Sequence, residues 1–146
     1  RWRGDAQQAK RQLDIATTLL GDEAQKANLR WMRYDLLGYL AEDLEEAREH
    51  RVAALEAVSE SGHVTAIAQV LVGIADQALR NEEYEQAARL LAASAAVRGL
   101  PDRSNPDVAR IEQTAQRRLG DARFTEATRE GAQARWEALA EVTLAS

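Results

Sequence analysis

Few side chains of this chain could do chemistry, and only two of them are histidines. Glu46 precedes His50 by four residues, so on a helix the two side chains would share one face and could ligate a metal ion together. A metal site needs at least one more ligand, and the sequence offers none nearby. We therefore interpret Glu46 and His50 as a solvated pair on a helix face, and we predict no metal site.

Ser59, Ser61 and His63 could be drawn as a nucleophile beside its base. They stand where a helix is expected to end, and polar side chains at helix ends commonly bond the backbone instead. Capping is therefore the favoured interpretation. The phosphate-binding pattern G-x-x-x-x-G-K does not occur in the sequence either. We expect no catalytic residues, no cofactor and no enzymatic activity.

The charge balance argues against a nucleic-acid partner. The 146 residues include 24 acidic and 19 basic side chains, which gives a net charge of −5, whereas binders of the phosphate backbone are usually basic. The basic face around Arg117 and Arg118 is diluted by acidic neighbours. No apolar run approaches the roughly 20 residues that cross a bilayer. With no cysteine in the chain, we expect a cytoplasmic protein without nucleic-acid or membrane contacts.

Helices are expected throughout, because glycine and proline are sparse and alternating β-branched runs are lacking. Asp43 and Asn105 are predicted N-caps, and Gly62 a predicted stop. The helix near residues 64–79 is apolar around much of its circumference, which predicts that it is sandwiched between neighbours. The predicted helices cover about 6–20, 23–40, 44–61, 64–79, 83–97 and 106–119, with two short terminal helices divided near Gly131.

A repeat underlies this series of helices. Ala9, Ala47 and Ala87 end three similar polar hexads, GDAQQA, EDLEEA and EEYEQA, at spacings of 38 and 40 residues. A further 40 residues lead to Ala127. A period near 40 with two helices per unit is typical of an α-solenoid, in which helical hairpins stack side by side. Alanine suits the point where two helices of a hairpin cross closely.

The stretch from Trp31 to Ala54 resembles a tetratricopeptide repeat, whose pattern is W-x2-L-G-x2-Y-x8-A-x3-F-x2-A. Trp31, Ala47 and Ala54 match the pattern. Its leucine, glycine, tyrosine and phenylalanine positions are occupied here by Tyr34, Asp35, Gly38 and Arg51. The resemblance implies an all-α fold, a right-handed α-solenoid of antiparallel helical hairpins with about seven helices. We expect one domain over residues 1–146, with repeat hairpins in 1–103 and C-terminal capping helices in 104–146.

The C-terminal third is similar to the closing segment of large bacterial transcriptional regulators of the AfsR/SARP and LuxR types. The similarity lies in Arg117-Arg118-Leu119-Gly120, Phe124, Gly131 and the helix Trp136–Leu144. It implies a non-enzymatic regulatory domain that binds a protein partner or the regulator's own nucleotide-binding module, while a different domain reads DNA. Because the chain has no initiating methionine and opens on a helix signal, we expect it to be part of a larger protein.

In tetratricopeptide arrays the first helix of each hairpin lines a concave groove that receives a protein or peptide. Carried over, this implies a partner-binding face made of Met32, Leu36, Tyr39, Gln69, Val72, Asp76 and Arg80. Leu36 and Val72 also suit a core position, whereas Tyr39, Asp76 and Arg80 are expected to be exposed contacts. A free-standing adaptor, or a solenoid that binds a small ligand or peptide in the same groove, stays open as the alternative. The partner's identity and a homodimeric state stay open too.

Overall fold

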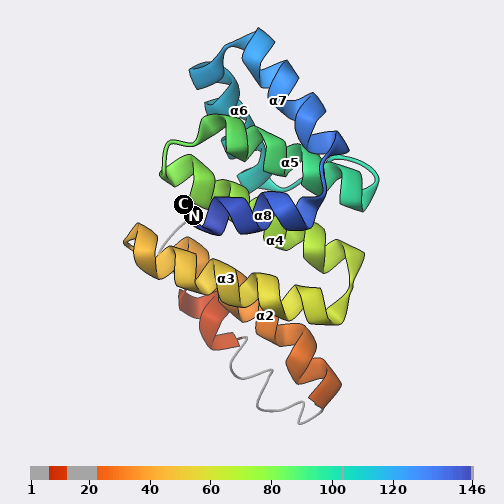
Figure 1. The fold of residues 1–146 in the computed structure, drawn as a ribbon. Coiled ribbons are helices and arrows are strands. Elements are labelled where there is room, and N and C mark those ends of the chain that lie inside the picture. Colours follow the sequence, from red (N-terminus) through yellow and green to blue (C-terminus); the bar gives the residue numbers. More distant parts are fainter. Residues whose placement is uncertain (1–6, 13–22, 103, 146) are drawn as a thin grey trace.

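The computed structural model describes residues 7–12, 23–102 and 104–145, and these are almost entirely helical (Figure 1). The all-α class is confirmed, since no strand occurs in the described ranges. Residues 7–12 are helical, while the rest of the helix predicted over 6–20 lies outside the described residues. The labelled helices are α2 (Glu23–Leu40), α3 (Leu44–Ser61), α4 (Val64–Arg80), α5 (Tyr84–Arg98), α6 (Pro106–Leu119), α7 (Asp121–Gln133) and α8 (Trp136–Ala145).

Local capping signals fix several of these boundaries. The Asp43 side chain accepts a hydrogen bond of 2.8 Å from the backbone N–H of Glu46, which starts α3. The Asn105 side chain accepts a hydrogen bond of 2.9 Å from the backbone N–H of Asp107, which starts α6. Gly62 ends α3 in the left-handed conformation, with φ of 69°. The predicted caps and stop are confirmed at all three places.

The predicted division of the two terminal helices near Gly131 is confirmed, since α7 ends at Gln133 and α8 begins at Trp136. The α7 helix runs through Gly131 and ends at Gln133. A Cβ atom at this position would collide with the backbone of Arg89 on α5, so Gly131 serves close helix packing and does not break the helix. Gly120 occupies the N-cap position of α7, and Asp121 is the first residue of the helix.

The α4 helix lies at the centre of the molecule. Short turns join α2 to α3 and α4 to α5, and the helices of each pair pack against one another as hairpins. The α4 helix also contacts α2, α3, α6 and α8, and its Val70, Leu71 and Ile74 are fully buried. The predicted sandwiching of this apolar helix is confirmed.

The last helix returns to the middle of the molecule. Figure 1 shows α8 between α3 and α5, alongside α4, and it packs against all three. Arg48 of α3 donates a hydrogen bond of 3.3 Å to the carbonyl of Leu144, and Gln86 of α5 donates one of 3.0 Å to the hydroxyl of Thr143. Hence α8 links two hairpins instead of extending the molecule beyond α7. Among the described residues, no helix is both long and apolar enough to cross a membrane.

Candidate functional site

A groove runs between α2, α4 and the helical residues 7–12. Its volume is about 550 Å³, and most of its lining is apolar or aromatic. We call it the α2–α4 groove. It is lined by Ala9, Gln12, Trp31, Met32, Asp35, Leu36, Tyr39, Thr65 and Gln69.

Four of the seven predicted partner-binding residues meet in this groove, namely Met32, Leu36, Tyr39 and Gln69. Met32 is the most accessible large apolar side chain among them, at 38% exposed. Leu36 is only 8% exposed, so it belongs to the core and forms the floor of the groove at the same time. The groove thus combines an exposed thioether with a preformed apolar base.

The predicted exposure of Asp76 is wrong. Its side chain is 4% exposed, and its carboxylate accepts a hydrogen bond of 2.6 Å from Arg110 of α6. The second carboxylate oxygen lies 3.9 Å from the guanidinium of Arg51. A buried carboxylate needs such partners to offset its lost hydration, so Asp76 joins helices together inside the protein.

Arg80 and Val72 also lie away from the groove. The Arg80 guanidinium donates to the carbonyls of Gly38 and Ala41, at 3.2 and 2.7 Å, and so satisfies the free C-terminal end of α2. The prediction of Arg80 as an exposed contact is therefore wrong. Val72 is fully buried, as its alternative core interpretation requires, and lines a separate small pocket.

Tyr39 is a groove residue whose hydroxyl oxygen is buried rather than exposed. Its ring lies 4.1 Å beneath the guanidinium carbon of Arg51, a cation–π contact. Burial, followed by the charge of Asp35, raises the pKa of the Tyr39 phenol well above its ordinary value, while Arg51 opposes the shift. The phenol therefore stays neutral beside the groove.

A buried ion network lies beneath this surface. Arg51 is completely buried, and its Nη1 donates to the Asp35 carboxylate at 2.6 Å and to the Asp35 carbonyl at 3.0 Å. Through Asp76 the network continues to Arg110, which also reaches the Asp107 carboxylate at 3.4 Å. Five charged side chains thus link α2, α3, α4 and α6, and one of them, Asp35, reaches the groove.

Two glycines make room for the buried arginine. A Cβ atom at Gly38 or Gly73 would collide with the Arg51 guanidinium, and at Gly73 also with the Asp35 carboxylate. Asp35, Gly38 and Arg51 are three of the positions that depart from the tetratricopeptide pattern. Sequence reasoning missed the network, although a signal was present: in one unit an acid replaces the glycine of the pattern, a glycine replaces the tyrosine, and an arginine replaces the phenylalanine.

The histidines show no further chemistry. His50 Nε2 lies 3.9 Å from Glu46 Oε1, and its ring stacks on Tyr34 with the ring centres 6.5 Å apart. Within the described part of the chain, no three histidine or acidic side chains gather as a metal site would require. His63 takes the N-cap position of α4, without a side-chain capping bond.

Comparisons with protein-family models, with curated proteins and with solved structures find no match to this chain. The functional argument therefore depends on the geometry of the α2–α4 groove and of the charges beneath it.

Proposed function

We propose that the chain is a non-enzymatic interaction domain that binds a segment of a protein in the α2–α4 groove. The observation that carries this proposal is the groove itself, in which Trp31, Met32 and Leu36 offer a preformed apolar surface. Aromatic and methionine side chains are enriched in the centres of protein interfaces, and methionine adapts to varied apolar partners.

The charges beneath the groove define the chemistry of the bound segment. The ion network contains three carboxylates but only two guanidiniums, so it carries one negative charge in excess. Burial is the main cause of the raised pKa of Tyr39, and the nearby carboxylates, Asp35 first, add to it while Arg51 opposes it. Trp31 and Tyr39 add two aromatic rings beside Asp35. A segment with apolar anchors and one lysine or arginine is complementary to this surface.

Two features support a tetratricopeptide-like α-solenoid as the framework of this groove. The helices α2, α4 and α6, which open successive hairpins, contact one another in order, as first helices do in a solenoid. The sequence repeats with a period near 40 residues. The position of α8 between α3 and α5 is a departure from a simple array.

The similarity of residues 117–144 to bacterial transcriptional regulators supports a regulatory setting for the domain. In that setting the bound segment comes from a partner protein or from the regulator's own nucleotide-binding module. A second candidate is a free-standing adaptor or small-ligand binder. It is favoured by the groove volume of about 550 Å³, which lies within the roughly 300–1,000 Å³ of small-molecule sites. A nucleotide-binding module encoded upstream in the same gene would favour the first candidate over the second.

The test is an NMR titration of the labelled domain with two short amphipathic peptides. They share leucine and phenylalanine at helical spacing and differ only in a central lysine or glutamate. We expect the lysine peptide to bind more tightly and to shift the signals of Trp31, Met32 and Gln69. Met32→Glu should abolish binding, and Val142→Glu on α8, at a more exposed apolar position outside the groove, should not. Absence of binding by both peptides, or shifts confined to other helices, would refute the proposal.

A further inference from the structure

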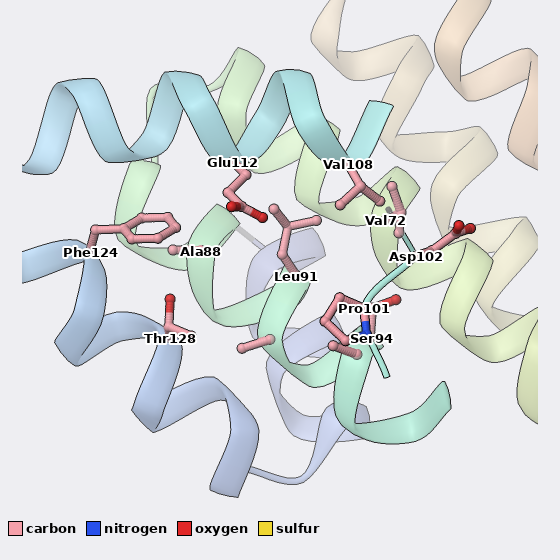
Figure 2. Close-up of a pocket in the computed structure, with 12 residues that line it drawn as sticks. Val72, Ala88, Leu91, Ser94, Pro101, Asp102, Val108, Glu112, Phe124 and Thr128 are labelled. Carbon is pink, nitrogen blue, oxygen red and sulfur yellow. The ribbon is translucent and has the colours of Figure 1, made fainter. Parts of the chain in front are cut away.

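A second pocket lies where α5, α6 and α7 meet, apart from the α2–α4 groove. Figure 2 shows Leu91 on α5, Glu112 on α6, and Phe124 and Thr128 on α7 around one small hollow. Its volume is about 160 Å³. We call it the junction pocket.

Small side chains on α5 create this hollow. Ala88, Ala92 and Ala95 recur at helical spacing and line the pocket with methyl groups, where larger residues would fill it. Leu91 and the Phe124 ring form its walls. The interior of the pocket is therefore apolar and has room for a small ligand. An engineered apolar cavity of about 150 Å³ binds benzene, which sets the scale of a suitable ligand.

Two solvent-exposed polar side chains stand at the edge of the pocket. The Glu112 carboxylate and the Thr128 hydroxyl form no hydrogen bond or ion pair with any residue that the structure describes. In Figure 2 the Glu112 carboxylate extends over the hollow, between the Phe124 ring and Leu91. By contrast, the Ser94 hydroxyl already donates to the carbonyl of Ala68 at 2.7 Å.

The other acidic group at the pocket already has partners. Asp102 accepts hydrogen bonds from Ser104 and lies 3.8 Å from Arg98. Hydrogen bonding from Ser104 lowers the pKa of Asp102, so its carboxylate stays ionised beside the Arg98 guanidinium. The recognition group of the pocket is therefore the Glu112 carboxylate, because Asp102 is already paired with Arg98.

We propose that the junction pocket binds a small primary ammonium compound with a single ring or a branched aliphatic body. The apolar body of the ligand enters the junction pocket and packs against α5. Its ammonium group donates hydrogen bonds to the Glu112 carboxylate and the Thr128 hydroxyl. Charge complementarity selects the amine over a carboxylate of the same shape. This site is independent of the α2–α4 groove, so either can exist without the other.

Three probes of nearly equal shape test the proposal: benzylamine, benzyl alcohol and benzoate. Each is titrated into the labelled domain while the methyl signals of Leu91, Ala92 and Val108 are followed by NMR. We expect benzylamine to shift these signals at the lowest concentration, benzyl alcohol at higher concentration, and benzoate not at all. Equal affinity for the three probes, no response to benzylamine, or benzylamine shifts mapping elsewhere would overturn the assignment.

Three variants separate the charge from the cavity. Glu112→Gln should weaken benzylamine binding about threefold, the scale of one exposed ion pair, and leave benzyl alcohol unchanged. Glu137→Gln on α8 removes another exposed carboxylate, outside the junction pocket, and should change neither affinity. Thr128→Leu fills the hollow from an exposed position of α7 and should abolish binding of both probes. An unaltered benzylamine affinity in Glu112→Gln or Thr128→Leu, with the thermal unfolding temperature unchanged, would refute the proposed site.

Discussion

Arg51 of α3 and Asp35 of α2 form a buried ion pair, with Nη1 of the guanidinium 2.6 Å from Oδ1 of the carboxylate. The same nitrogen donates to the main-chain carbonyl of Asp35. Arg51 therefore binds both the side chain and the backbone of one residue of α2. Because Asp35 also lines the α2–α4 groove, the pair connects the interior of the protein to its candidate binding surface.

Arg51→Met should lower the free energy of unfolding by about 3–5 kcal/mol, because it leaves the Asp35 carboxylate buried without a guanidinium. Urea unfolding followed by circular dichroism measures the loss. Arg30→Met is the matched control, since Arg30 pairs with Glu60 at 2.7 Å on the surface. That change should cost less than about 1 kcal/mol.

Asp35→Asn should lower the free energy of unfolding less in the Arg51→Met background than in the wild-type protein. A buried neutral amide costs less than a buried unpaired carboxylate, so removing the charge relieves part of the defect. The double-mutant cycle gives the coupling between the two side chains. Additive losses would show that the pair does not act as a unit.

Much of this fold could be predicted from the sequence because its signals are local. Asp43 and Asn105 cap helices with side chains only two or three residues from the N–H groups that they bind. The apolar circumference of α4 predicted its central position. By contrast, the path of α8 depends on faces of α3 and α5 that are distant in sequence, and no local pattern specifies which of them it meets.

The candidate site was harder to predict than the helices. Met32, Leu36, Tyr39 and Gln69 were found because first-helix faces share a side of the hairpins. Asp76 was misjudged because an acidic residue in an apolar helix is expected to be exposed unless its partner is known. That partner, Arg110, lies 34 residues away, and the three-dimensional packing alone brings the two together.

Gly73→Ala should destabilise the protein, although replacing a glycine inside a helix by alanine ordinarily stabilises it by roughly 0.5–1 kcal/mol. The added Cβ would collide with the guanidinium of Arg51. In an Arg51→Ala background only the Asp35 carboxylate still meets the added Cβ, so the loss should become smaller. Gly38→Ala, which also meets Arg51, should follow the same pattern in urea unfolding. A loss that is the same in both backgrounds would contradict the packing described for Gly73.

Tyr39 should make stability fall with pH under alkaline conditions. Burial and the Asp35 charge raise the pKa of its phenol in the folded protein, whereas the unfolded chain titrates near the ordinary value of 10.0. The unfolded state therefore loses this proton first, and the stabilisation is complete below pH 10 and declines as the pH rises above it. Tyr39→Phe cannot ionise and should show a shallower decline. Parallel urea-midpoint curves for the two proteins above pH 10 would contradict the expected role of Tyr39.

Leu144→Ala should uncouple α8 from the two hairpins that it joins. Leu144 is buried in the main core, its carbonyl accepts the bond from Arg48, and α8 packs against both α3 and α5. Truncating a buried leucine to alanine typically costs about 2–5 kcal/mol, and here the amide protons of α8 should exchange with solvent sooner than those of α4. Val142→Ala changes a side chain of the same helix that is 63% exposed and should cost less than about 0.5 kcal/mol. Equal effects of the two substitutions would mean that α8 lies on the surface without stabilising the hairpins, and its return between α3 and α5 would then need another explanation.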